Sequence, residues 1–337
     1  MKFSKYGIAA FIFLTFVSEV GAQKLNQAQR RERIDSVLSA RYYRSPYDTN
    51  YVVRPEGKLT LKVRFNQTGN TFHSKGTING IYSKADLKTS HKTTVSIGAS
   101  YRGISAALAI NPAKLSGAYK DYELNLNYFS SRLSLDFSYQ RSETLAGDIE
   151  RDNHLEQLET GDASLKIVNL AGYYTFNHRH FSYPAAFTQS YIQRRSAGSW
   201  LAGISYQGGS IKTSDQLKAR KPDAADMSIE IGHIGIGGGY GYNWVLGKKK
   251  EWLLHFSMLP TVVVYNRNKI TINGVRKEAE HMRVNMLFNE RVAIIYNFSP
   301  RYFAGTTAVL NNSVFKDDNV TINQNKWRVR AFFGMRL

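Results

Sequence analysis

Residues 58 to 66 read Lys-Leu-Thr-Leu-Lys-Val-Arg-Phe-Asn, with an apolar side chain at every second position. Successive side chains of a β-strand point to opposite faces of a sheet, so this alternation predicts a strand with two different faces. Leu59, Leu61, Val63 and Phe65 form the apolar face, and Lys62 and Arg64 lie on the other face.

The same alternation recurs along most of the chain. Two pairs of runs are separated only by Arg102-Gly103 and by Ser130-Ser131, which predicts tight hairpins at both places. Twelve runs are found in all, at residues 58–66, 94–101, 104–110, 122–128, 133–139, 166–177, 199–208, 229–244, 252–265, 282–298, 301–310 and 325–337.

The connections between these runs alternate in length. If the first strand runs outward, the outer connections are 67–91, 111–120, 141–164, 209–228, 266–281 and 311–324, and the inner ones are 102–103, 130–131, 178–198, 245–251 and 299–300. Outer-membrane barrels have short periplasmic turns and long outer loops. The sequence therefore predicts an all-β fold, a transmembrane antiparallel β-barrel of about twelve strands with both chain ends in the periplasm. A soluble β-sandwich would not expose an apolar face on nearly every strand.

The composition agrees with this fold. The chain has 337 residues and a hydrophobic fraction of 42%, and its mean hydropathy of −0.37 argues against a bundle of membrane-spanning helices. The chain has no cysteine, which excludes disulfides, thiolate zinc sites and a cysteine nucleophile. Its net charge of +19 favours anionic partners.

The N-terminus has the layout of a secretory signal peptide. Lys2 and Lys5 precede the apolar run 8–17, and Val20-Gly21-Ala22 offers small residues before Gln23. The apolar run is too short to span a bilayer. We therefore expect export to the bacterial outer membrane with cleavage after Ala22.

The predicted organisation has three parts. Residues 1–22 are the signal peptide, 23–56 are a periplasmic N-terminal segment, and 57–337 are the barrel. The N-terminal segment suggests a helix over 26–41, and a second short helix is expected to begin at Pro184, as a cap below the barrel.

The first and last strands carry basic side chains on their polar faces. Closing the barrel requires these two strands to pair, which brings Lys62 and Arg64 near Arg328 and Arg330 as a lumen basic strip. Glu123 and Asp136 are the expected lumen acids. We expect the strip either to face water or to be balanced by acids of the N-terminal segment, with Asp35, Asp48 and Glu56 as candidates.

Five short motifs together are similar to a known family. They are Tyr47-Asp48-Thr49-Asn50-Tyr51, Ser100-Tyr101-Arg102-Gly103, Phe181-Ser182-Tyr183-Pro184-Ala185-Ala186-Phe187, Ser196-Ala197-Gly198-Ser199 and Phe333-Gly334-Met335-Arg336-Leu337. In combination they resemble the family catalogued as domain of unknown function 4421, predicted outer-membrane β-barrels of Bacteroides-type bacteria. The resemblance implies fold and location, and it implies no reaction.

The sequence motifs that could indicate a nucleotide, metal or catalytic site do not meet the requirements of such sites. Gly235 to Gly241 fails the dinucleotide fingerprint and fits a strand in which glycines admit close neighbours. His178 and His180 are expected to be solvated turn residues. His255 and Ser257 share a strand face, but a spacing of about 7 Å predicts that they do not bond, and His233 has no serine partner.

Glu290 falls on the apolar face of its strand, and we expect a bulge near Asn289 to turn it inward.

From these motifs, no catalytic, cofactor-binding or metal-binding residue is predicted.

Three functions remain open. The leading hypothesis is a structural or passive-transport barrel with a basic, anion-preferring lumen. The alternatives are an outer-membrane lipid-modifying enzyme and a surface barrel for adhesion or partner binding. The expected partners are outer-membrane lipids, small anionic solutes or acidic sugars, and the outer-membrane assembly machinery during insertion, with no nucleic acid and no cofactor.

Cleavage after Ala22 is directly testable. N-terminal sequencing of the protein recovered from the outer membrane should begin at Gln23. Ala22→Lys should block cleavage, because the residue before the cut must be small, and should leave a heavier chain. A wild-type chain that still begins at Met1 would contradict the assignment.

Overall fold

The computed structural model describes residues 46–57, 59–78, 81–101, 104–110, 121–152, 154–224, 226–278, 282–317 and 320–337. It also describes residues 28–29, 32–33 and 36, which are helical. The chain divides into two compact units, Met1–Arg44 and Ser45–Leu337, and the second unit contains all of the β-sheet. Among the residues described, no helix is long and apolar enough to cross a membrane.

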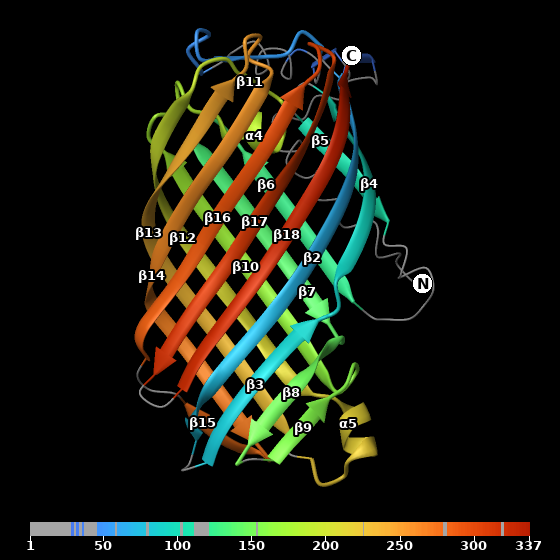
Figure 1. The fold of residues 1–337 in the computed structure, drawn as a ribbon, viewed down its shortest axis with the longest axis vertical. Coiled ribbons are helices and arrows are strands. Elements are labelled where there is room, and N and C mark those ends of the chain that lie inside the picture. The colour runs from blue at the N-terminus through green and yellow to red at the C-terminus, as the bar shows by residue number, and fades with distance from the viewer. Residues whose placement is uncertain are drawn as a thin grey trace. The chain divides into compact units, whose positions relative to one another are not determined.

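The second unit is built on a large antiparallel sheet that curls into a β-barrel (Figure 1). Each of the twelve predicted runs falls on one of its strands. These strands are β2 (Leu59–Ile78), β4 (Lys92–Tyr101), β5 (Ile104–Ile110), β6 (Tyr122–Phe129), β7 (Leu133–Ser142), β10 (Ala163–Thr175), β12 (Ala197–Thr213), β13 (Met227–Leu246), β14 (Trp252–Ile272), β16 (Met282–Asn297), β17 (Tyr302–Asp317) and β18 (Val320–Arg336).

The first and last long strands pair, as predicted. The register of β2 against β18 runs from Thr60 opposite Arg336 to Gly76 opposite Val320. Beyond it, Leu59 and Leu337 exchange two backbone hydrogen bonds of 3.0 and 2.7 Å. The connection between β5 and β6 includes residues 111–120, outside the described residues, so the number of strands in the wall stays a prediction.

The outer connections contain more structure than predicted. Residues expected to be loops form β3 (Ile81–Thr89), β8 (Leu145–Arg151), β9 (His154–Leu158), β15 (Val275–Glu278) and the helix α5 (Asp215–Arg220). Figure 1 shows these elements together at one end of the barrel. The short strands β9 and β15 carry polar side chains at consecutive positions, Glu156-Gln157 and Arg276-Lys277, so the sequence has no period-two signal there.

Burial alternates along β2 as the sequence predicts. Leu61, Val63 and Phe65 expose 37%, 53% and 51% of their surfaces, whereas Lys62, between Leu61 and Val63, exposes 4%. The apolar face therefore points outward and the basic face points into the interior of the barrel, which we call the lumen.

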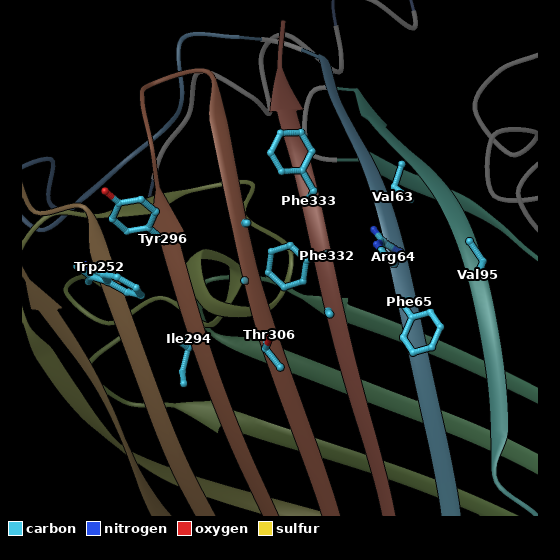
Figure 2. A pocket seen from close by; sticks show the side chains of 13 residues that line it. Val63, Arg64, Phe65, Val95, Trp252, Ile294, Tyr296, Thr306, Phe332 and Phe333 are labelled. Carbon is cyan, nitrogen blue, oxygen red and sulfur yellow. The ribbon is translucent and has the colours of Figure 1, made fainter.

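Aromatic rings gather on the outward face near the C-terminal end of β18. Trp252 lies 4.5 Å from Tyr296 between ring centroids, and Tyr296 lies 4.7 Å from Phe298. Figure 2 shows a shallow hollow here, where Ala304, Gly305 and Ala331 are smaller than the rings around them. Such a belt is typical of the boundary between hydrocarbon and lipid headgroups.

The glycine run lies in β13, where it permits close approach of β14. A Cβ atom added at Gly237 would lie 2.1 Å from the carbonyl oxygen of Pro260, and one at Gly239 would lie 2.0 Å from that of Met258. This agrees with a structural role for these glycines and not with a phosphate loop.

The predicted bulge near Asn289 is wrong. Glu290 pairs in regular register with Met258 on one side and Leu310 on the other, and the only shift in β16 lies between Met282 and Val284. Because β14 and β17 both continue through this point, hydrogen bonding on two sides fixes the register. Glu290 consequently stays on the outward face.

We expect Glu290→Leu to stabilise the barrel. A carboxylate facing hydrocarbon is unfavourable, so the free energy of unfolding in lipid vesicles should rise by about 1 kcal/mol. Urea titration followed by tryptophan fluorescence measures this change. Glu156→Leu, on the exposed strand β9, is the matched control and should give no gain. Equal effects of both changes would place Glu290 outside the hydrocarbon.

Candidate functional site

The end of the barrel near the C-terminus is filled by residues 178–196, which we call the plug. Its helix α4 (Tyr183–Phe187) begins after Ser182, whose hydroxyl accepts a hydrogen bond of 3.2 Å from the Ala185 amide. Pro184 at the start of the helix fits the fixed φ angle that a first turn requires. The helix predicted at Pro184 is present, but it ends at Phe187.

Apolar residues of α4 pack against inward-facing apolar residues of the wall. Ala185 and Ala186 are buried in a cluster with Leu253, Ala293, Ile295, Phe303 and Phe332. The expectation that inward faces are polar is therefore wrong at this end. The reason is that these residues contact the plug instead of water, so both faces of the strands are apolar here.

Residues 46–57 also contact the plug. Val52 and Val53 of β1 (Val52–Val53) pair with Gln193 and Ile192 of β11 (Ile192–Gln193). The Ser182 hydroxyl donates to the Tyr47 hydroxyl at 3.1 Å, and burial raises the pKa of Tyr47. These contacts join the N-terminal part of the unit to the plug.

Lys62 of the basic strip ends in the plug. Its ammonium donates to the Thr188 carbonyl oxygen and, at 2.8 Å, to the Gln189 side-chain oxygen. The Gln189 amide in turn donates to the Ala186 carbonyl oxygen at 2.8 Å. A cation at the C-terminal end of a helix satisfies carbonyl groups that have no partner within the helix.

The other members of the strip lie along the β2–β18 seam. Arg330 donates to the Asn66 side-chain oxygen at 2.6 Å, and Arg328 is opposite Thr68. Arg64 is opposite Phe332, two positions from Lys62. The register therefore brings all four predicted residues to one side of the lumen.

The acids proposed to balance the strip have other positions. Asp48 accepts from the Asn50 amide, which lowers the pKa of Asp48, and lies 3.5 Å from His180. Glu56 is exposed, and Asp35 lies outside the described residues. Glu123 accepts from Thr68 at 3.0 Å and lies 3.8 Å from the Lys326 ammonium.

Asp136, the second predicted lumen acid, belongs to a compact cluster. The Arg291 guanidinium donates to Asp136 and to the Tyr173 hydroxyl, and that hydroxyl donates to Asp136. Arg291 and Asp136 also line a cavity of ≈ 40 Å³, together with Lys326 and Arg328. A cavity of this size holds about one water molecule.

A chain of hydrogen bonds connects the plug to two strands of the wall. Asn243 of β13 donates to the Ser182 carbonyl oxygen at 3.1 Å and to the Gln193 side-chain oxygen at 3.0 Å. Its own side-chain oxygen lies 2.7 Å from His255 Nδ1, and His255 Nε2 lies 2.9 Å from Ser257 Oγ. Asn243, His255 and Ser257 are all buried.

The prediction that His255 and Ser257 do not bond is wrong. The repeat of about 7 Å applies to Cα atoms, whereas a side chain leans along its strand and an imidazole spans much of that distance. Asn243 could not be paired with them from the sequence, because only the β13–β14 register places it opposite His255.

Residues of the two neighbouring strands flank Ser257. Arg291 of β16 and Gly241 of β13 are its cross-strand neighbours. The Tyr183 ring lies 5.2 Å from the ring of His255, the hydrogen-bond partner of Ser257. A Cβ atom at Gly241 would lie 3.1 Å both from Ser257 Cβ and from the Phe181 ring, so this glycine makes room for Phe181.

The remaining histidines have ordinary environments. His180 bonds Asn177 at 3.0 Å, and the exposed His178 bonds the Phe176 carbonyl oxygen at 3.1 Å. The buried His233 ring stacks on Phe315 at 4.2 Å. Within the described ranges, no group of three or more His, Cys, Asp or Glu residues is arranged to hold a metal ion.

Comparisons with known proteins identify a family. The model of a family described as domain of unknown function (DUF4421) matches residues 46–336. A search of curated proteins gave no match.

Solved structures with similarity to this chain include an outer membrane protease, the translocator domain of an autotransporter and a toluene transporter. The outer membrane protease OmpT of Escherichia coli is 7% identical, covers 84% of this chain and 97% of its own, and gives a TM-score of 0.44. The translocator domain of the autotransporter NalP of Neisseria meningitidis is 9% identical, with coverages of 92% and 96% and a TM-score of 0.29. The toluene transporter TodX of Pseudomonas putida is 8% identical, with coverages of 84% and 91% and a TM-score of 0.26. At these TM-scores, nothing about the activity of this chain follows from the similarity.

The Arg291–Asp136 pair should matter to stability. Arg291→Met leaves a half-buried carboxylate without its cation, so we expect a loss of about 3 kcal/mol in the free energy of unfolding. Adding Asp136→Asn to the same chain should recover part of that loss. Urea unfolding in vesicles measures both, with the exposed Arg267→Met as control. No recovery in the double variant would show that the pair is not coupled.

Proposed function

This chain belongs to the DUF4421 family, and we propose that it is an outer-membrane β-barrel that passes small anions through a basic lumen when the plug moves. The outward apolar face and its aromatic belt support a position in a bilayer. In the proposed orientation, the plug faces the periplasm and β3, β8, β9 and α5 face outward.

The observation that carries this proposal is the excess of cations on the inward face of β2 and β18. The inward face of these two strands carries Lys62, Arg64, Lys326, Arg328, Arg330 and Arg336. Among the described residues, only Lys326 of this set forms an ion pair with a carboxylate, that of Glu123 at 3.8 Å. Cations on the wall of a low-dielectric channel raise the local concentration of anions and set the charge preference of a pore.

In this proposal, the arrangement of the plug is the closed state of the pore. The plug fills one end of the lumen, and above it the Arg291–Asp136 cluster leaves a cavity of only ≈ 40 Å³. Passage of a small anionic solute or an acidic sugar therefore requires the plug to move. Lys62 is the charged contact between the strip and the plug, so an anion that binds Lys62 competes with Thr188 and Gln189.

Planar-bilayer conductance tests the proposal. Wild-type protein should show low, infrequent conductance. A variant with residues 183–190 replaced by a flexible Gly-Ser linker should be open more often and should prefer chloride over potassium in a salt gradient. In that open variant, Arg328→Gln with Arg330→Gln should lower the anion preference, because two wall cations are removed.

A second variant protects the test from misfolding. Lys62→Met keeps the plug sequence and removes only its charged contact, so it should raise the open probability by a smaller factor. Heat-modifiable migration in electrophoresis verifies that each barrel is folded. An open plug variant with no anion preference, or with a preference unchanged by the two arginine substitutions, would overturn the proposal.

A further inference from the structure

The hydrogen bonds around Asn243 determine which atoms of His255 carry hydrogen. The Gln193 amide nitrogen donates to the carbonyl oxygens of His180, at 2.5 Å, and Arg195, at 2.9 Å. Carbonyl oxygens only accept, so the Gln193 side-chain oxygen must point the other way. It therefore accepts from the amide nitrogen of Asn243 and cannot donate to it.

The same logic continues into the wall. The Asn243 amide nitrogen also donates to the Ser182 carbonyl oxygen, so the Asn243 side-chain oxygen is the atom that faces His255 Nδ1. A neutral imidazole carries one N–H group, and Asn243 requires it at Nδ1. His255 Nε2 is then an acceptor, and Ser257 must donate its hydroxyl proton to it.

From this geometry we propose that Ser257, His255 and Asn243 form a serine hydrolase site inside the barrel that cleaves carboxylic acyl esters. A nucleophile, a base that takes its proton and a polar group that orients the base are the three roles of such a site, whatever the fold. Asparagine serves as the orienting group in some of these arrangements.

The reaction has two half-steps with the same residues. Ser257 Oγ attacks the ester carbonyl carbon and its proton moves to His255 Nε2; the ester C–O bond then breaks as that proton passes to the leaving alcohol. Water next attacks the acylated Ser257, again losing a proton to His255, which returns it to Ser257 Oγ as the carboxylic acid leaves. Asn243 holds the Nδ1–H group throughout.

One donor for the developing oxyanion lies next to Ser257. The Arg291 side chain is its cross-strand neighbour. Donors fixed before the reaction stabilise the negative charge of the tetrahedral intermediate without reorganising.

The surroundings indicate an ester with an apolar acyl group and an adjacent negative charge. The rings of Phe181, Tyr183 and Phe187 lie 5.8, 5.2 and 5.0 Å from the His255 ring and form an apolar surface. Arg291, which lies 5.6 Å from the Phe187 ring, supplies a cation that a negative group of the substrate could share with Asp136. The substrate class that fits both features is an acylated anionic amphiphile.

Access to Ser257 depends on the end of α4. Ser257 exposes 2% of its surface, and the Phe187 ring contacts both His255 and Arg291, the latter at 5.6 Å. A substrate therefore reaches Ser257 only when Phe187 moves aside. Shortening this side chain should open the site and leave the hydrogen-bond chain intact, since Phe187 takes no part in it.

Covalent labelling of the folded, full-length mature protein in detergent tests the proposal. An alkyl fluorophosphonate should add to Ser257, with fluoride leaving and the proton passing to His255, and peptide mass spectrometry identifies the labelled residue. Ser257→Ala should abolish labelling, His255→Gln should slow it about 100-fold, and Asn243→Leu should slow it about 10-fold. Phe187→Ala should accelerate labelling severalfold.

The same variants are assayed for hydrolysis of p-nitrophenyl butyrate across pH. Wild-type activity should fall toward acid as the histidine becomes protonated, a dependence that a purely structural role does not produce. Ser199→Ala is the matched control, because Ser199 is equally buried but donates to the Trp200 carbonyl oxygen and should not matter.

Two results would overturn the proposal of a serine hydrolase site. One is no labelling of Ser257 in either wild type or Phe187→Ala while heat-modifiable migration shows folded barrels. The other is labelling of His255→Gln at the wild-type rate. Conductance is not involved in either result, so failure here leaves the anion-passage proposal standing, and the reverse also holds.

Discussion

The pairing of β2 with β18 is the contact on which the rest of the structure depends. Hydrocarbon offers no hydrogen-bonding partner to a free strand edge, and each unpaired backbone group there costs several kcal/mol. The Leu59–Leu337 hydrogen bonds complete this seam at its last residue. Its register fixes which face of every neighbouring strand meets lipid, and that in turn gathers the basic side chains of two distant segments on one wall.

A sheet of this size that curls into a barrel creates an interior that must be filled. At one end the filling is the plug, which provides aromatic and alanine side chains for an apolar wall and backbone carbonyls for Asn243. Further along, the filling is the Arg291–Asp136–Tyr173 cluster. Unpaired buried charges are costly, so the long cations end on carbonyl, amide or carboxylate oxygens wherever the structure supplies them.

The two proposed activities place opposite demands on the plug. Anion passage needs the plug to leave the lumen, whereas the hydrolase needs Gln193 of the plug to orient Asn243 and so to set the tautomer of His255. An open barrel would therefore lack the oriented base, and a catalytically ordered barrel would conduct poorly. Lys62 contacts the plug at Thr188, and Phe187 of the plug contacts His255. Changes at these two contacts should shift the balance between the open and the ordered plug.

The sequence by itself determined where the long strands lie and which of their residues face outward, because period-two alternation is a local property of the chain. It also determined that the first and last long strands pair, because an edge strand in hydrocarbon needs a partner. The same information could not place Glu290 correctly, since two neighbouring strands, and not its own sequence, fix its register. It also missed short strands such as β9 and β15, in which consecutive residues are polar. Only the tertiary structure brought Asn243 to His255 and let His255 reach Ser257. The physical reason is that cross-strand register and side-chain lean decide hydrogen bonds to within an ångström, and a sequence pattern fixes only which face each side chain occupies.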